Sequence, residues 1–288
     1  MRYLTLVQAV EAFARASQID ISSLNGGDAF QYDMQGKELT AILHAAGNDS
    51  AEKRRLSWEA LEKRLIAATV FDRLSKEPNG QRHVGWKRDA AFSYDRVGLL
   101  ALFLREYAVA TEARREASII FEELGQPEDA AFSAVHSSDA CSHLFLVGDS
   151  RALDRAQMML PSIEQVPDNA KIHCRDVSRR IAYERIPRND FVVELGRDIV
   201  SGQSYDVTTA NSARRRGVKV IKAGWKQYGA MLMAVAVRTY AGNGDHKTAL
   251  DSCYRAITVL GGPQCQDIRT VFASERSRLF QQDSTRTT

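Results

Sequence analysis

Apolar residues recur at helical spacing along nearly the whole chain, and the strict alternation that marks a β-strand is almost absent. The stretch 50–76 is typical, because its apolar residues are spaced three, four and three apart and form one stripe: Trp58, Leu61, Leu65 and Ala68. Lysine, arginine and glutamate side chains occupy the opposite face. This pattern predicts an all-α protein.

Turn-forming residues divide the pattern into segments. Gly125 ends one helix, and Pro127 suits the first turn of the next, where a backbone N–H is not needed. Glycine, aspartate, asparagine and serine predict a loop from Ile19 to Gly36, and Pro161 is expected to break a helix at 151–165. The other helices are expected at residues 2–16, 37–46, 94–109, 111–124, 128–147, 170–185, 190–201, 212–228 and 265–281.

The clearest interruption lies at residues 78–89, where Pro-Asn-Gly-Gln stops a helix and basic residues follow. We expect a linker there. It separates a smaller helical N-terminal segment, 1–77, from a larger helical domain, 90–281. The polar tail 282–288 is expected to be disordered.

Residues 229–260 carry the most specific pattern. Two helices rich in small residues flank the turn Gly-Asn-Gly-Asp, which is too short for anything but antiparallel neighbours. With Ala249 at the small position where two helices meet, Tyr240 and Ala256 fall at further positions of a repeat of about 34 residues. Cys253 stands where that repeat has phenylalanine. The stretch resembles a tetratricopeptide-type helical hairpin.

This resemblance implies an irregular helical-repeat solenoid that builds a binding surface and performs no chemistry of its own. A fragment at 148–154 echoes the hairpin's turn, and a third at 116–131 is out of phase with it. Because only one unit is clear, an irregular helical bundle stays open as the alternative fold.

Composition narrows the class of protein. Of the 288 residues 44% are hydrophobic and 26% are charged, which is typical of a globular protein with a sizeable core. The longest apolar runs are far shorter than the roughly 18 residues of a membrane span, and no apolar core of a signal peptide appears. The four cysteines are too sparse for a disulfide framework. We therefore expect a cytoplasmic protein that does not enter a membrane.

The net charge of +3 is small, so any affinity for polyanions requires local clustering. Such a cluster exists, because no acid lies between Asp206 and Asp245. On one helix, four of its basic residues would form a single ridge beside an apolar one, and two aromatic side chains nearby suit stacking on bases. The candidate site residues are Arg214, Arg215, Arg216, Lys219, Lys222, Trp225, Lys226 and Tyr228. An ordinary amphipathic helix with a solvated face is the alternative.

Signals for catalysis or cofactors do not rise above background. The histidines and cysteines His136, Cys141, His143, His173 and Cys174 lack the close paired spacing of zinc ligands, so we expect no metal. Ser150 follows a Gly-Asp pair as in one hydrolase family, but no Asp-x-x-His accompanies it. No phosphate-binding glycine motif occurs, and no cofactor is expected.

Three functions follow from these observations. The first is a non-enzymatic scaffold or regulator that binds a peptide or helix of a protein partner in a groove between helices. The second is a nucleic-acid or polyanion binder that uses the basic segment 214–226. The third is an all-helical enzyme whose site has no recognisable motif.

Overall fold

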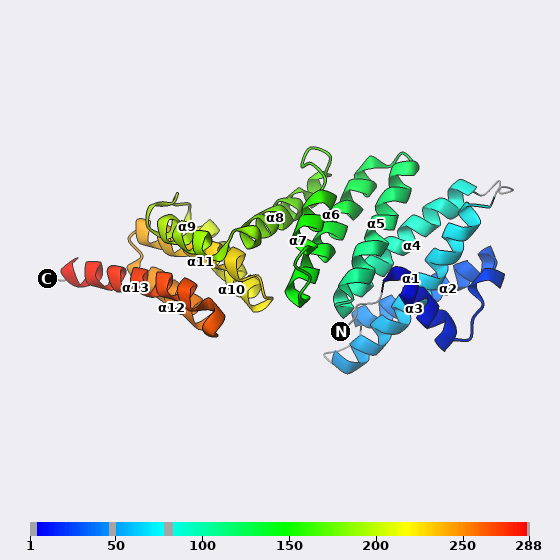
Figure 1. The fold of residues 1–288 in the computed structure, drawn as a ribbon, viewed down its shortest axis with the longest axis horizontal. Coiled ribbons are helices and arrows are strands. Elements are labelled where there is room, and N and C mark those ends of the chain that lie inside the picture. Colours follow the sequence, from blue (N-terminus) through cyan, green and yellow to red (C-terminus); the bar gives the residue numbers. More distant parts are fainter. Residues whose placement is uncertain (1–4, 46–49, 78–82, 287–288) are drawn as a thin grey trace. The chain divides into compact units, whose positions relative to one another are not determined.

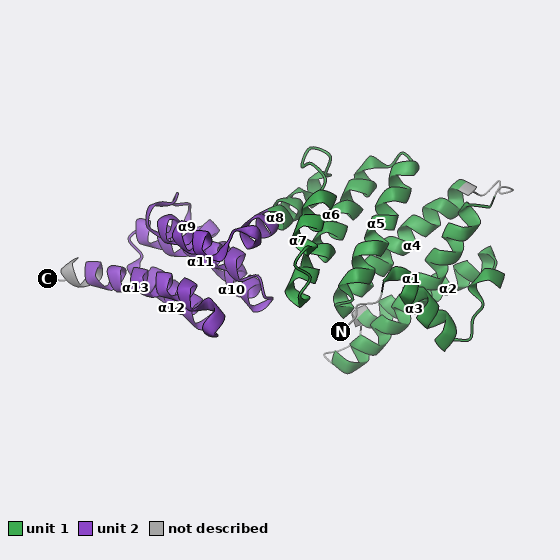
Figure 2. Cartoon of the chain, in the orientation of Figure 1, with its two compact units in different colours: residues 1–178 green, residues 179–288 purple. Residues whose placement is uncertain are grey.

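The computed structural model describes residues 5–45, 50–77 and 83–286, which form thirteen α-helices and three short 3-10 helices (Figure 1). No strand occurs among these residues, so the all-α prediction is confirmed. The chain divides into two compact units, Met1–Ser178 and Arg179–Thr288 (Figure 2). The boundary falls inside helix α8 (Asp168–Arg185).

In the first unit, each helix from α2 to α6 packs against the next one along the chain, and α1 contacts α3 and α5. This sequential packing is what short connections between helices produce. Its elements are α1 (Leu6–Ala16), η1 (Ile21–Ser23), α2 (Gly26–Ala45), α3 (Ser50–Ser75), α4 (His83–Leu104), α5 (Tyr107–Glu123), α6 (Pro127–His143), η2 (Leu144–Val147), α7 (Ala152–Met159) and the first part of α8.

The predicted loop from Ile19 to Gly36 was wrong, because α2 already begins at Gly26. Its first N–H groups are capped by the side chain of Asn25, which accepts from the N–H of residue 27 at 2.7 Å. Glycines that resemble loop residues in the sequence serve close packing instead. A Cβ at Gly26 would lie 2.4 Å from the ring of Trp86, and one at Gly36 would lie 2.9 Å from Cγ of Arg64.

The expected linker at 78–89 also differs from the structure. Residues 83–89 form the first turns of α4, and residues 78–82 lie outside the described residues. The border between the two compact units lies between Ser178 and Arg179, about one hundred residues after the predicted linker. At the other end, α13 runs to Arg286, through most of the tail expected to be disordered.

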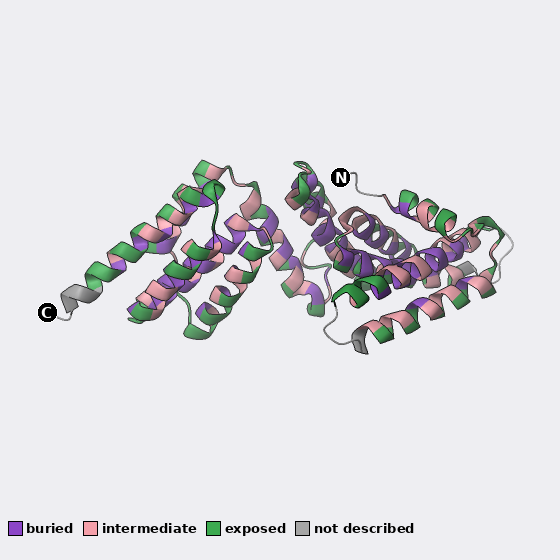
Figure 3. Cartoon of the chain, turned by 90° about the horizontal axis from the view of Figure 1, so that it is seen from below, coloured by how far each residue is buried: buried purple, intermediate pink, exposed green. Residues whose placement is uncertain are grey.

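In the second unit, α10 to α13 again pack against their neighbours in sequence, and α9 contacts α11 and α13. Figure 3 shows how the buried positions gather where helices of one unit face each other. The elements are α9 (Arg188–Ser201), α10 (Val207–Lys222), α11 (Lys226–Gly242), α12 (His246–Val259), η3 (Pro263–Cys265) and α13 (Gln266–Arg286).

The helical hairpin expected at 229–260 is present as α11 and α12. Gly244 in its turn has φ +80°, a conformation that glycine adopts without strain, and Asp245 caps α12 by accepting from the N–H of Thr248 at 3.0 Å. Ala249 is fully buried, as its predicted position between two helices requires.

Three helices carry the same order of side chains. An alanine is followed by arginine four residues later, by alanine or glycine after seven, and by two large apolar residues after ten and eleven. The copies begin at Ala60 in α3, Ala110 in α5 and Ala210 in α10, so successive residue numbers differ by 50 (110 − 60) and 100 (210 − 110). All three alanines are fully buried. This spacing differs from the 34-residue period that guided the sequence analysis.

No described helix is both long enough and apolar enough to cross a membrane.

Candidate functional site

The basic residues predicted as one ridge lie on two helices. Arg215, Lys219 and Lys222 are exposed along α10, and Lys226 is the first residue of α11, beyond the turn at Gly224. The Nζ of Lys226 donates to a backbone carbonyl at the end of α10 at 3.1 Å. Lys226 therefore helps to cap α10. The basic ridge predicted from four residues consists of three in the structure, Arg215, Lys219 and Lys222.

Tertiary contacts supply acids that the sequence segment lacks. Arg214 forms an ion pair with Asp251 of α12, with 3.0 Å between nitrogen and oxygen. Arg238, at the far end of the acid-free stretch, is paired with Asp198 of α9. Arg216 lies 6.0 Å from the ring centre of Tyr228. The positive field of the segment is therefore smaller than its composition indicates.

The two aromatic residues proposed to stack on bases are in the core. Trp225 and Tyr228 each expose only 2% of their surface. The guanidinium of Arg180 lies over the indole of Trp225 at 4.5 Å, and the ring of Tyr183 stacks on Tyr228 at 6.0 Å. Stacking on a nucleic-acid base requires an exposed ring face, so this part of the prediction was wrong.

A partly buried carboxyl group contacts the start of α11 beside these rings. Glu184 of α8 accepts hydrogen bonds from the N–H groups of Gln227 and Tyr228, at 2.9 and 3.0 Å. These N–H groups lie in the first turn of α11 and have no partner within the helix. Burial raises the pKa of Glu184 to about 7, against the opposing effect of the two hydrogen bonds.

The structure brings together three histidines that lie apart in the sequence. His143 and His173 approach the two carboxyl oxygens of Asp139, at 3.6 and 3.2 Å, and His136 stacks on His173 with ring centres 4.7 Å apart. Burial, together with the nearby Arg114 and His173, lowers the pKa of His136 to about 4. Asp139, the centre of the cluster, was not singled out in the sequence.

The cysteines considered as zinc ligands do not join these histidines. The Sγ atoms of Cys141 and Cys174 instead lie near the backbone carbonyls of Ala152 and Pro161, at 3.5 and 4.0 Å. Over the described ranges, no group of three or more histidine, cysteine, aspartate or glutamate side chains has a geometry that suits a metal ion.

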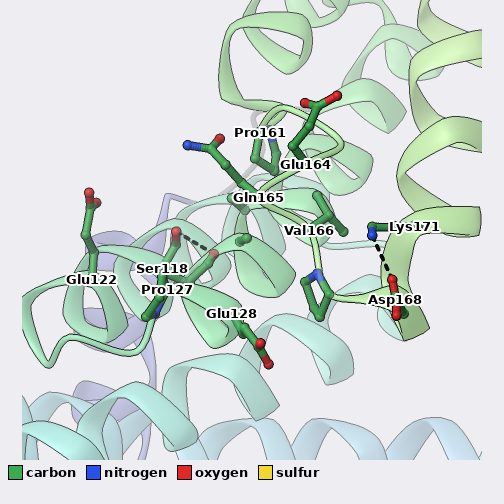
Figure 4. Close-up of a pocket in the computed structure, with 14 residues that line it drawn as sticks. Ser118, Glu122, Pro127, Glu128, Pro161, Glu164, Gln165, Val166, Asp168 and Lys171 are labelled. Atoms are coloured by element: carbon green, nitrogen blue, oxygen red, sulfur yellow. Dashed lines mark hydrogen bonds and ion pairs between the residues drawn. The ribbon is translucent and has the colours of Figure 1, made fainter.

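The first unit has a cleft of about 720 Å³ formed by α5, α6, the segment before α8 and the start of α8 (Figure 4). Its walls combine small side chains and prolines with carboxylates. The lining residues are Ser118, Glu122, Pro127, Glu128, Ala130, Ala131, Ala134, Pro161, Glu164, Gln165, Val166, Pro167, Asp168 and Lys171.

Charge in this cleft is mainly negative. Glu122, Glu128 and Glu164 are exposed and have no ion pair with any described residue. The one lysine, Lys171, points to Asp168 and binds it at 2.7 Å (Figure 4). These three carboxylates are therefore available to bind a positively charged group that enters the cleft.

Local contacts hold the cleft open. The hydroxyl group of Ser118 donates to the carbonyl of Ala130 at 2.9 Å and ties α5 to the first turns of α6 (Figure 4). Behind the opposite wall, Val166 and Cys174 are buried with Val135 of α6. The cleft is thus built by residues spread from position 118 to position 171. No single stretch of sequence predicts it.

The first two copies of the repeated pattern hold a buried ion pair. Arg64 of α3 is paired with Asp33 of α2, and Arg114 of α5 is paired with Asp95 of α4. The two arginines expose only 9% and 5% of their surface. Burial lowers the pKa of Arg114 to about 10.

Each pair is completed in the same way by its neighbours. The hydroxyl groups of Ser93 and Ser133 donate to Asp33 and Asp95 respectively, both at 3.2 Å. Each aspartate is followed three residues later by a glycine, Gly36 or Gly98, that makes room for the arginine side chain. Alignment of residues 60–74 with 110–124 would have found these arginines in the sequence.

Comparison with known proteins does not assign this chain to a family. No family model matches this chain, and neither a curated protein nor a solved structure is detectably similar to it.

Proposed function

We propose that this protein is a non-enzymatic interaction scaffold whose first unit binds a basic peptide segment of a partner in the α5–α6–α8 cleft. The observation that carries the proposal is the combination of a cleft of about 720 Å³ with three carboxylates that have no ion pair among the described residues. A peptide rich in lysine or arginine would supply the missing charges.

We further infer that the architecture is an irregular helical repeat related in principle to tetratricopeptide arrays. Sequential packing of helices and the pattern shared by α3, α5 and α10 support this inference. Such arrays bind extended or helical segments on surfaces that several helices build together. The cleft has that construction, because four separate elements line it.

Other features of the cleft favour a peptide over a small metabolite. The cleft opens to solvent and its charged groups stand on its rim, as the exposure of Glu122, Glu128 and Glu164 indicates. Small-molecule sites are usually enclosed and mainly apolar, with few polar groups. Prolines and alanines, whose side chains are short, line part of the wall and leave room for the backbone of an extended chain.

The polyanion-binding alternative keeps the support of Arg215, Lys219 and Lys222, which are exposed and have no ion pair with a described residue. It loses the support of Trp225 and Tyr228, which are buried. Three cations on one helix supply a weak, salt-sensitive affinity and no means of distinguishing bases. We therefore prefer the scaffold.

Fluorescence anisotropy with two labelled probe peptides tests the proposal. One peptide alternates lysine with serine, and its counterpart alternates glutamate with serine. We expect the lysine peptide alone to bind, and the variant Glu122→Gln/Glu128→Gln/Glu164→Gln to lose about tenfold in affinity, since each exposed pair contributes about 0.2–1 kcal/mol.

The matched control is Glu11→Gln/Glu77→Gln/Asp190→Asn, which removes the same charge from exposed positions outside the cleft. It should bind the lysine peptide almost as well as the parent does. Equal losses in the two triple variants would mean that net charge, and not the cleft, attracts the peptide. That result would refute the proposed site.

A further inference from the structure

A second surface of the first unit exposes large apolar side chains in a regular order. On α4, Phe92, Leu99 and Phe103 expose 43%, 48% and 59% of their surface. Together with Arg96 they follow the spacing i, i+4, i+7 and i+11, which places all four on one face of the helix. Three turns of α4 therefore present an apolar stripe that contains one cation.

Helix α2 carries a matching stripe. Phe30 and Met34 expose 45% and 50% of their surface, and Lys37 follows one turn later at the same helical spacing. Phe30 and Phe92 occupy equivalent positions, because each precedes the aspartate of its ion pair, Asp33 or Asp95, by three residues. The stripes thus belong to equivalent faces of the two helices.

A hollow of about 270 Å³ separates the two stripes. Phe30 and Lys37 line it from α2, Phe92 and Arg96 line it from α4, and α3 closes its floor. A hollow of this size accommodates one or two side chains of a partner, not a whole cofactor.

The charges that are free to act on this surface are positive. Lys37 and Arg96 are exposed and have no ion pair among the residues that the structure describes, whereas Asp33 is occupied by Arg64 and Ser93. Two other acids lie near: Asp89, which lines the hollow, and the exposed Glu38 of α2. Burial and the neighbouring Asp33 raise the pKa of Asp89, which weakens its negative charge.

Single exposed apolar residues are ordinary, but a contiguous set is not. Five large apolar side chains occupy corresponding faces of the two helices: Phe30, Met34, Phe92, Leu99 and Phe103. Of these, Phe30 and Phe92 line the hollow between the helices. A pair of neighbouring stripes with a hollow between them matches the groove in which an amphipathic helix lays its own apolar face.

We propose that the α2–α4 face binds an amphipathic, acidic helix of a partner protein, whose apolar side chains enter between Phe30 and Phe92 and whose carboxylates face Lys37 and Arg96. The charge of the surface selects this occupant, because a basic amphipathic helix would meet the unpaired cations. This surface is separate from the acidic cleft and prefers a partner of the opposite charge.

The test uses two labelled helical peptides of about eighteen residues, a length at which such helices begin to be populated. One places leucine at i, i+3, i+4 and i+7 with glutamate elsewhere, and the other replaces every glutamate by lysine. We expect the leucine–glutamate peptide to bind and the leucine–lysine peptide to bind at least about tenfold more weakly.

Two double variants locate the surface. Leu99→Ser/Phe103→Ser removes exposed apolar anchors, and Lys37→Gln/Arg96→Gln removes the cations; each should weaken binding about tenfold or more. The control Val193→Ser/Val200→Ser changes two residues of α9 that are 62% and 60% exposed, and it should bind like the parent. Circular dichroism confirms that each variant keeps its helix content.

Three outcomes would overturn the proposal: no binding of the leucine–glutamate peptide, equal binding of both peptides, or equal losses in the control. A concentration-dependent dimer that is abolished by Leu99→Ser/Phe103→Ser would also overturn it, because a second copy would then occupy the face. The triple glutamate variant of the cleft should leave this binding unchanged, so the two surfaces fail or succeed independently.

Discussion

Arg114 of α5 is buried against Asp95 of α4, and Gly98 of α4 leaves space for the arginine side chain. The same arrangement of Arg64 and Asp33 occurs one helix pair earlier. Buried ion pairs contribute little net stability, but we expect these two to fix the register of their helices, because a shifted register would leave a charge without its partner.

This relationship predicts the effect of removing one charge or both. Arg114→Met should lower the free energy of unfolding by about 3–5 kcal/mol, since the carboxylate of Asp95 remains without its partner. The double variant Arg114→Met/Asp95→Leu should recover much of that loss, because it removes both charges. Denaturant unfolding measures the difference, and a double variant no more stable than the single one would contradict the prediction.

Ala249 should not tolerate a larger side chain. It is fully buried in the core of the second unit, and overpacking such a position costs about 1–3 kcal/mol. Ala249→Leu should therefore lower the melting temperature by several degrees, as thermal unfolding followed by circular dichroism would show. Tyr254→Leu, at a position of α12 that is 58% exposed, serves as the control and should melt near the parent.

His136 should make the first unit less stable in mild acid. Its pKa is about 4 in the folded protein and 6.5 ordinarily, so between these values the unfolded chain binds a proton that the folded chain does not. The free energy of unfolding therefore falls as the pH drops from 7 to 5, by up to about 2 kcal/mol from this residue.

The variant His136→Gln separates the contribution of this side chain from that of the rest of the protein. Denaturant unfolding of both proteins at pH 7 and pH 5 should give a smaller loss for the variant. Identical losses would show that His136 accepts a proton in the fold as readily as it does in the unfolded chain.

The exposed cations of α10 should bind nucleic acid weakly, and only at low salt. Lys219→Gln/Lys222→Gln should reduce the slope of log K against log salt for duplex DNA by roughly two units, one for each phosphate that the variant can no longer neutralise. Lys247→Gln, an exposed position on α12, is the control. Sub-micromolar binding near physiological salt that this double variant abolishes would favour the polyanion function over the scaffold.

Local signals in the sequence were sufficient for much of the helical pattern. Helix α6 begins at Pro127 as expected, and the α11–α12 hairpin was predicted from its small residues and short turn. These features depend on residues that are neighbours in the chain: caps, breakers and the period of apolar positions. The all-α class followed from the same information.

The sequence pattern led to a wrong prediction at glycines that allow close packing between helices. Gly26 and Gly36 resemble loop residues, but they lie in α2, and these positions require glycine because Trp86 and Arg64 occupy the space of a side chain. Nothing in a segment of sequence tells whether its glycine provides a turn or a close approach. The repeated arginine pattern was visible in the sequence, but only at a spacing that differs from the expected repeat.

The sequence by itself determined the helical class, the hairpin and the cluster of basic residues from Arg214 to Lys226. Only the tertiary structure decided which charges remain free, because Asp251 reaches Arg214 from another helix and the core encloses Trp225. It also created the acidic cleft from elements separated along the chain. The physical reason is that helices form from contacts within a few residues, whereas burial and charge neutralisation depend on distances through space.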